Sequence, residues 1–131
     1  MTIAGEEPMF ELKILTRFAA AHQLQMVSQK CENLHGHNWK IEVCVTGSTL
    51  DQAGVVMDFG LLKAHVKEII ETLDHKFLNE IKVCDGQPSS ENIAVYIAES
   101  LADKLAGTPV QVSRVTAWES DDAAASYIPE K

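Results

Sequence analysis

Residues 31–45 read CENLHGHNWKIEVCV, and the second part of this stretch decides the fold around it. From about Asn38 to Thr46, large apolar residues alternate with more polar ones, which is the period of a half-buried β-strand. His35 and His37 stand two residues apart at its start, so a strand would turn both side chains to one face. Two residues of strand rise about 6.5 Å, and imidazoles at that separation can lean onto one metal ion. The stretch therefore predicts a strand with a candidate metal site at its start.

A third histidine, His22, follows a run of alternating apolar residues that predicts a first strand from about Met9 to Ala21. If the two strands pair antiparallel, His22 comes beside His35 and His37 and completes a set of three nitrogen ligands. Three protein ligands with an open fourth position are typical of a catalytic zinc site. A histidine pair alone is weaker evidence, because histidines on a strand face are more often packed or solvated.

Two amphipathic helices are predicted further along the chain. Asp58 is a suitable N-cap for the first, which runs from Phe59 to Leu73 with apolar residues at helical spacing. The second is capped by Ser89 or Ser90 and ends at Gly107, as expected for a glycine after the last helical turn.

Two more strands are predicted after the helices, over residues 110–119 and 124–128, with irregular connections over residues 23–33 and 79–87. The element order ββααββ predicts an α+β fold, in which a four-stranded antiparallel sheet carries both helices on one face. Open edges on so small a sheet invite pairing with another chain, and a closed barrel would remove them. We therefore expect an oligomer.

The composition bounds the class of protein. With 131 residues and 46% hydrophobic content, we expect a disordered lead-in over residues 1–8 and a single domain over residues 9–131. The net charge of -8 argues against binding to nucleic acid or anionic membranes, which draw on basic surface. No apolar run reaches membrane-span length and no signal peptide is evident, so a cytoplasmic location is expected. Three cysteines, an odd number, leave at least one free as a reagent.

Six short motifs occur in order along nearly the whole chain. They are Phe18-x-Ala20-x-His22, Cys31-x-x-x-His35-Gly36-His37-Asn38, Val56-Met57-Asp58-Phe59-x-x-Leu62-Lys63, Leu73-Asp74-His75-x-x-Leu78-Asn79, Ser89-Ser90-Glu91-Asn92 and Trp118-Glu119. In this combination the chain resembles the 6-pyruvoyltetrahydropterin synthase and 6-carboxytetrahydropterin synthase family. The resemblance implies the tunnelling fold, a homohexamer of trimeric barrels stacked in pairs, a zinc ion, and 7,8-dihydroneopterin triphosphate as substrate.

The resemblance implies that His22, His35 and His37 hold the zinc, whose open position receives the hydroxyls of the substrate side chain. It implies Cys31 as general base, a thiolate stabilised by the nearby cation that takes a proton from the carbon chain beside the pterin ring. From spacing alone, Cys31 fits a fourth ligand of a closed structural zinc site equally well.

Five further residues take roles from the resemblance. Asp74 and His75 would form a second proton-transfer pair supplied by a neighbouring subunit, although without the resemblance they read as a helix end. Glu119 would accept two hydrogen bonds from the guanidine-like edge of the pterin. Without the resemblance, Glu119 is interpreted as a solvent-exposed strand residue with no functional role. Ser89 and Ser90 stand where the family uses small hydroxyl residues near the pterin.

Two activities compete within this resemblance. The carboxy enzymes form a precursor of 7-deazaguanine (queuosine) and release the side chain as acetaldehyde and triphosphate, whereas the pyruvoyl enzymes eliminate triphosphate and serve biopterin synthesis. The three residues between Cys31 and His35 resemble the bacterial carboxy branch, so we predict a zinc-dependent lyase of that type. The acidic net charge is a departure, because a triphosphate needs local cations such as Arg17, Lys30 or Lys76.

Other classes fit less well. His35-x-His37 followed by Glu42 resembles half of a cupin metal motif, but the helix predicted over residues 59–73 stands where a cupin needs a second histidine-bearing strand pair. A non-enzymatic, zinc-stabilised interaction module is the more distant alternative.

Overall fold

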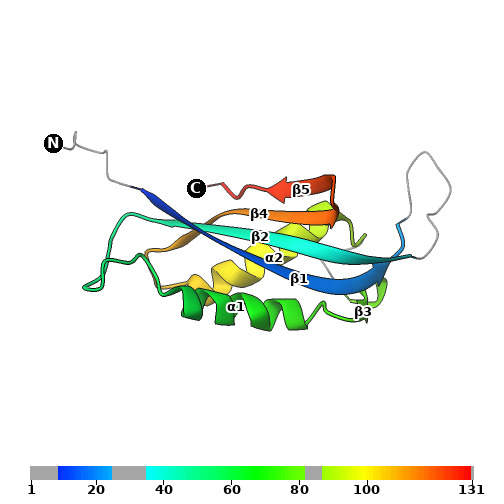
Figure 1. Cartoon of the computed structure of the whole chain (residues 1–131), viewed down its shortest axis with the longest axis horizontal. Coiled ribbons are helices and arrows are strands. Elements are labelled where there is room, and N and C mark those ends of the chain that lie inside the picture. The colour runs from blue at the N-terminus through cyan, green and yellow to red at the C-terminus, as the bar shows by residue number, and fades with distance from the viewer. Residues whose placement is uncertain (1–8, 25–34, 82–86, 131) are drawn as a thin grey trace.

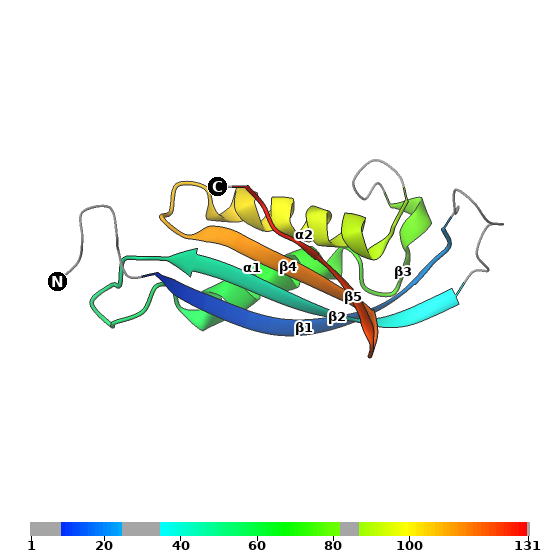
Figure 2. The same ribbon diagram turned by 90° about the horizontal axis from the view of Figure 1, so that it is seen from above.

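The computed structural model describes residues 9–24, 35–81 and 87–130, which form one sheet and two helices (Figure 1). The elements are β1 (Phe10–His22), β2 (His35–Gly47), α1 (Phe59–Glu71), β3 (Lys76–Phe77), the 3-10 turn η1 (Leu78–Glu80), α2 (Ser90–Leu105), β4 (Gln111–Ser120) and β5 (Ala123–Tyr127). Both helices lie on the same face of the sheet, with α2 running along β4 and β5 (Figure 2). The predicted α+β class is confirmed.

The sheet has the order β3-β1-β2-β4-β5. β1 and β2 pair antiparallel over their whole lengths, with His22 opposite His35 and Ala20 opposite His37, so the predicted pairing of the two histidine-bearing strands is confirmed. β4 and β5 extend the sheet antiparallel on the other side of β2. The four predicted strands are therefore all present, and the two histidine-bearing strands β1 and β2 are neighbours in the sheet.

A fifth strand, β3, was not predicted. It pairs parallel with β1 through only two residues, at Ala20 and Ala21. A two-residue strand is too short to show any period in the sequence, and it is a strand only because the edge of β1 offers main-chain partners. The sheet is thus five-stranded and mostly antiparallel, instead of four-stranded and fully antiparallel.

The hydrophobic core lies between the helices and the sheet. The apolar positions that alternate along β2 are all buried, as their period predicts. The helices bury their predicted stripes against them. Those stripes consist of Leu62, Val66, Ile69 and Ile70 in α1, and of Ile93, Ala94, Ile97, Ala98, Leu101 and Leu105 in α2.

Both helices begin at the predicted caps, since the Asp58 side chain accepts from the backbone N–H of Gly60 and the Ser89 side chain accepts from that of Asn92. The boundaries elsewhere move by one to three residues. β2 begins at His35 instead of Asn38, and α1 ends at Glu71 instead of Leu73. End positions depend on tertiary contacts that a period does not contain.

Several expectations fall outside the described residues, namely the lead-in over residues 1–8 and the two cysteines Cys31 and Cys84. Cys44 is a buried free thiol in β2. Among the described helices, none has the length and apolar character needed to cross a membrane.

Candidate metal centre

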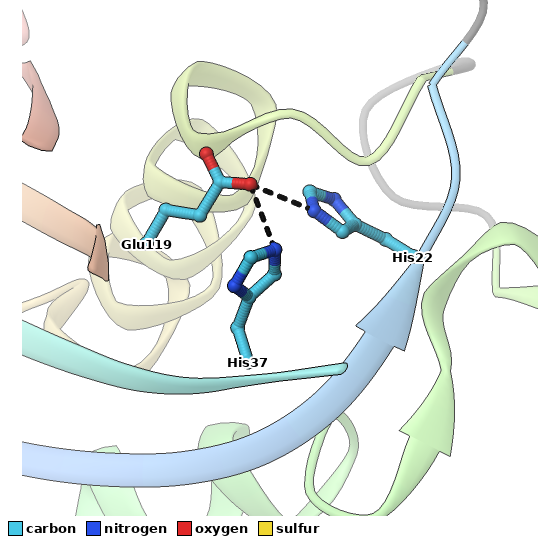
Figure 3. A group of neighbouring side chains, drawn as sticks. All are labelled: His22, His37 and Glu119. Atoms are coloured by element: carbon cyan, nitrogen blue, oxygen red, sulfur yellow. Dashed lines mark hydrogen bonds and ion pairs between the residues drawn. The ribbon is translucent and has the colours of Figure 1, made fainter. Parts of the chain in front are cut away.

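Three side chains from three strands converge at one end of the sheet (Figure 3). Oε1 of Glu119 lies 2.9 Å from Nε2 of His22 and 2.9 Å from Nε2 of His37. One possible ligand atom from each of the three residues lies within 4.8 Å of the other two. Two imidazole nitrogens and a carboxylate oxygen are a donor set that zinc uses in catalytic sites. The three residues could therefore hold a divalent metal ion.

Strand register explains why these residues meet. In β1, His22 lies two residues beyond Ala20, which pairs with His37, so both imidazoles fall on the same face. β4 pairs with β2 as far as Trp118, and Glu119 comes next. The pairing between β4 and β5 shifts register at this point, so Glu119 is the extra residue of a β-bulge. Figure 3 shows one Glu119 oxygen directed at both rings and the other pointing away.

Trp39 packs against both imidazoles of this group. Its indole is fully buried and lies 5.1 Å from the ring centroid of His22 and 5.5 Å from that of His37, close to perpendicular to both. The two imidazoles are themselves edge to face, with centroids 4.9 Å apart. Phe18 stacks nearly parallel to the indole, with ring centroids 5.9 Å apart. Such packing holds both rings in one orientation without help from a metal.

The second nitrogen of His22 is also engaged. His22 is fully buried, and its Nδ1 lies 2.9 Å from the carbonyl oxygen of Pro88. A carbonyl can only accept, so Nδ1 must carry the proton in this hydrogen bond. Nε2 then either carries a second proton and donates to Glu119 as part of an imidazolium, or offers its lone pair to a metal ion. The second arrangement is the one found at histidines that bind metals.

The third predicted imidazole is placed by its main chain only. The backbone of His35 pairs with that of His22 at the start of β2, while its side chain is outside the described part of the structure. Cys31 is likewise outside it. The metal role of His35 and the proton-transfer role of Cys31 therefore stay predictions.

Asp74 and His75 form a contact pair just after α1. Nδ1 of His75 lies 3.1 Å from Oδ2 of Asp74, and the His75 side chain is 81% exposed. Oδ1 of Asp74 accepts from the backbone N–H of Ala19 at 3.0 Å. This hydrogen bond, followed by the charge of His75, holds the pKa of Asp74 below its ordinary value. The pair is thus more than a helix end, because it is fixed to β1 three residues before His22.

His75 adopts a left-handed backbone conformation, with φ of 59°. Histidine is one of the few side chains enriched there. In this conformation the backbone N–H of His75 donates to the carbonyl of Ala19 at 2.6 Å. The Asp74 carboxylate and the His75 N–H together occupy both main-chain groups of Ala19.

The two serines predicted to lie near the pterin, Ser89 and Ser90, stand at the start of α2. Ser89 is the N-cap of α2, where its hydroxyl accepts from the backbone N–H of Asn92 at 3.1 Å, and Ser90 is the first helical residue. The sequence predicted the capping and the proximity of Glu119 to the substrate, but not the contact of Glu119 with the imidazoles. The Trp118-Glu119 motif marks Glu119 as a candidate site residue. The motif does not say which residues Glu119 faces, because that depends on the order of the strands.

A small sheet that gathers imidazoles and a carboxylate at one end, with an aspartate and histidine pair fixed to the strand that carries His22, defines a candidate metal-dependent enzyme. The family model described as 6-pyruvoyl tetrahydropterin synthase matches residues 11–130. The chain belongs to this family.

Individual relatives agree with this membership. A Synechocystis protein named 6-carboxy-5,6,7,8-tetrahydropterin synthase is 38% identical over 115 residues, which cover 84% of this chain and 86% of that protein. A Pyrococcus furiosus protein named dihydroneopterin monophosphate aldolase is 38% identical over 105 residues, or 80% and 85% of the two chains. The solved structure of Caenorhabditis elegans 6-pyruvoyl tetrahydropterin synthase shares the fold, with a TM-score of 0.81, 24% identity, and coverage of 95% and 98%.

Proposed function

We propose that this chain is a zinc-dependent lyase that converts 7,8-dihydroneopterin triphosphate to 6-carboxy-5,6,7,8-tetrahydropterin, with loss of acetaldehyde and triphosphate. The observation that carries the proposal is the convergence of His22, His37 and Glu119 in a chain of this family. The relative named 6-carboxy-5,6,7,8-tetrahydropterin synthase supports the choice of product, as does the spacing of Cys31 to the histidines.

The zinc would be held by His22 and His37, with His35 as the third imidazole that the sequence predicts. When bound, zinc would acidify the hydroxyls of the substrate side chain. The protein's own part is to hold the two imidazoles rigid against Trp39 and to keep the proton of His22 on Nδ1. Cys31, four residues before His35, is proposed as the base that takes a proton from the carbon beside the pterin ring.

The second proton carrier would be His75, with Asp74 as its partner. The Asp74 carboxylate stays ionised because the Ala19 N–H lowers its pKa, and it holds the His75 ring in place through a contact of 3.1 Å with Nδ1. The exposed ring of His75 is consistent with a pair that serves a site on a neighbouring subunit. We also propose a homohexamer of paired trimers, for which the outer edge of β1, paired with only the two residues of β3 within the described part of the chain, offers a surface.

Glu119 is proposed to hold the pterin. A carboxylate can accept two parallel hydrogen bonds from the guanidine-like edge of the ring. Here one carboxylate oxygen contacts both imidazoles, so bidentate binding of a pterin requires that oxygen to leave them. We therefore assign Glu119 to the metal group in the free enzyme and to the pterin in the complex.

One alternative has a specific observation behind it. The aldolase relative is as similar to this chain as the carboxy synthase, and its name specifies a monophosphate substrate. Elimination of triphosphate with the carbon chain retained, as in the pyruvoyl enzymes, is the other alternative within the family.

Product analysis separates these activities. Purified protein loaded with zinc is incubated with dihydroneopterin triphosphate or monophosphate, and the products are identified by mass spectrometry. We expect acetaldehyde, triphosphate and 6-carboxytetrahydropterin from the triphosphate. Turnover of the monophosphate alone, or a pterin that keeps its three-carbon side chain, would replace this proposal by one of the alternatives. The cytoplasmic location that we also propose can be tested by cell fractionation.

A further inference from the structure

Two asparagine side chains outside the metal group bond to main-chain groups near His22: Asn79 to those of Gln23, the next residue, and Asn92 to that of Gln87, which precedes the ring's partner Pro88. We propose that Asn92 fixes the ring of His22 and Asn79 fixes its main chain, so that both are positioning residues for the metal centre. The inference rests on the proposed metal role of His22. It assigns a role to two residues of the sequence motifs, Leu78-Asn79 and Glu91-Asn92, that the function described above does not use.

Asn92 acts on the ring through the loop before α2. Its side-chain Nδ2 donates to the carbonyl oxygen of Gln87 at 2.7 Å, and the backbone N–H of Ser89 donates to the same oxygen at 2.9 Å. The residue between them is Pro88, which is buried and whose carbonyl accepts from Nδ1 of His22. Because the φ angle of proline is fixed, the direction of this carbonyl depends on how its two neighbours are held. Asn92 holds Gln87, one of these two neighbours, and so connects the loop to the first turn of α2.

Asn79 acts on the main chain on the other side. Its Oδ1 accepts from the backbone N–H of Gln23 at 2.8 Å, and its Nδ2 donates to the carbonyl of Gln23 at 2.6 Å. Gln23 directly follows His22. The short strand β3 pairs with Ala20 and Ala21, so the Asn79 amide continues that pairing with a side chain in place of a strand. The metal-bearing end of β1 is thereby fixed both before and after His22.

Both contacts bear on metal affinity. Removal of a partner that orients a metal ligand costs about 10–100-fold in affinity. A misdirected Pro88 carbonyl would no longer hold the proton on Nδ1 of His22, and a ring with its proton on Nε2 cannot offer that nitrogen to zinc. A frayed main chain at Gln23 would let the whole residue shift relative to His37.

The test uses isosteric variants. Asn92→Asp and Asn79→Asp keep the shape of the side chain but lose the N–H donor. Asn92→Asp also places a negative charge in the first turn of α2, which favours the helix, so loss of fold is not the expected result. The matched control is Thr108→Ala, which removes a side chain that likewise makes two backbone hydrogen bonds, to Leu105 and Val110, at the far end of α2.

Three quantities are measured on each protein: the zinc Kd by competition with a chromogenic chelator, the Tm of the metal-free protein, and the nitrogen chemical shifts of the neutral His22 ring. We expect both asparagine variants to bind zinc about 10–100-fold more weakly, the control to bind within about twofold of the parent, and only Asn92→Asp to shift the His22 tautomer. Unchanged zinc affinity in both asparagine variants would overturn the proposal. The proposal would also be overturned if the asparagine variants lost no more zinc affinity than a control variant whose Tm falls by a similar amount.

These readouts are separate from the proposed reaction. A wrong substrate or product would leave the zinc Kd and the ring tautomer of all four proteins as expected here. If the parent bound no zinc, the metal role of His22 would fail, while the tautomer shift in Asn92→Asp would still report whether Asn92 orients the ring.

Discussion

Replacement of Glu119 tests the metal centre most directly, since the structure gives this residue two contacts that the sequence did not. The perturbation is Glu119→Ala, with Glu119→Gln as a variant of the same shape that lacks the charge. A hydrogen bond to a charged group contributes about 1.5–3 kcal/mol. Glu119 makes two such contacts to the imidazoles, and its side chain is 30% exposed, so solvent screening favours the lower figure for each. Together the two contacts therefore contribute about 3 kcal/mol to the stability of the metal-free protein.

The assay measures two constants on one preparation. The zinc Kd of the substrate-free enzyme reports the contact with the metal group, and the KM for dihydroneopterin triphosphate reports the contact with the pterin. We expect Glu119→Ala to raise the zinc Kd by about 10–100-fold, because the metal loses a carboxylate ligand, and to raise KM at saturating zinc. The Tm of the metal-free protein should fall, because the carboxylate's contacts with the two imidazoles are lost. Glu119→Gln should fall between this variant and the parent, because an amide oxygen still accepts but carries no charge.

Three outcomes would refute parts of this reasoning. Tighter zinc binding by Glu119→Ala would show that the carboxylate competes with the metal for the imidazoles instead of supporting it. An unchanged zinc Kd would remove Glu119 from the metal group. An unchanged KM at saturating zinc would remove it from the pterin site.

Four other changes have defined outcomes. His35→Ala should purify with less than the roughly one zinc per chain expected of the parent, because the site loses an imidazole; equal zinc by metal analysis would place the site elsewhere. Cys31→Ala should keep its zinc and Tm but lose about 10²–10⁴-fold in kcat, the usual contribution of a positioned base, whereas loss of zinc and Tm together would make it a structural ligand. Trp39→Ala should lower the free energy of unfolding by about 3–5 kcal/mol, measured by urea denaturation, because a fully buried indole between Phe18 and the imidazoles is lost. Asp74→Asn should lower the free energy of unfolding at pH 6 but not in strong acid. Because the pKa of Asp74 is lowered in the folded protein, its stabilising contribution is present above the ordinary carboxyl pKa of about 3.9 and is lost as the pH falls through the lowered value. Urea midpoints of parent and variant that differ equally at pH 6 and about pH 2 would contradict this.

The sequence predicted the elements that have a period. The alternation in β1 and β2 and the helical stripes of α1 and α2 follow from which side chains must be buried, and this is written in the order of residues along each element. The same local rule puts His35 and His37 on one face of the strand, and the six motifs indicate the family without any tertiary information. The helix starts at Asp58 and Ser89 were also readable, because a cap is a contact within one turn.

The tertiary structure decided what lies around His22. Glu119 is 97 residues away along the chain and Pro88 is 66 away, yet both contact the same ring. Which residues meet across such separations depends on strand order and on the bulge that presents Glu119, and no period in the sequence encodes either. The amide of Asn79 that replaces a strand beside Gln23, and the two-residue strand β3 before it, exist only because β1 has an open edge there. The sequence by itself thus indicated the histidines as candidate metal ligands. Only the packed chain determined that Glu119 joins His22 and His37, and which groups hold His22 in place.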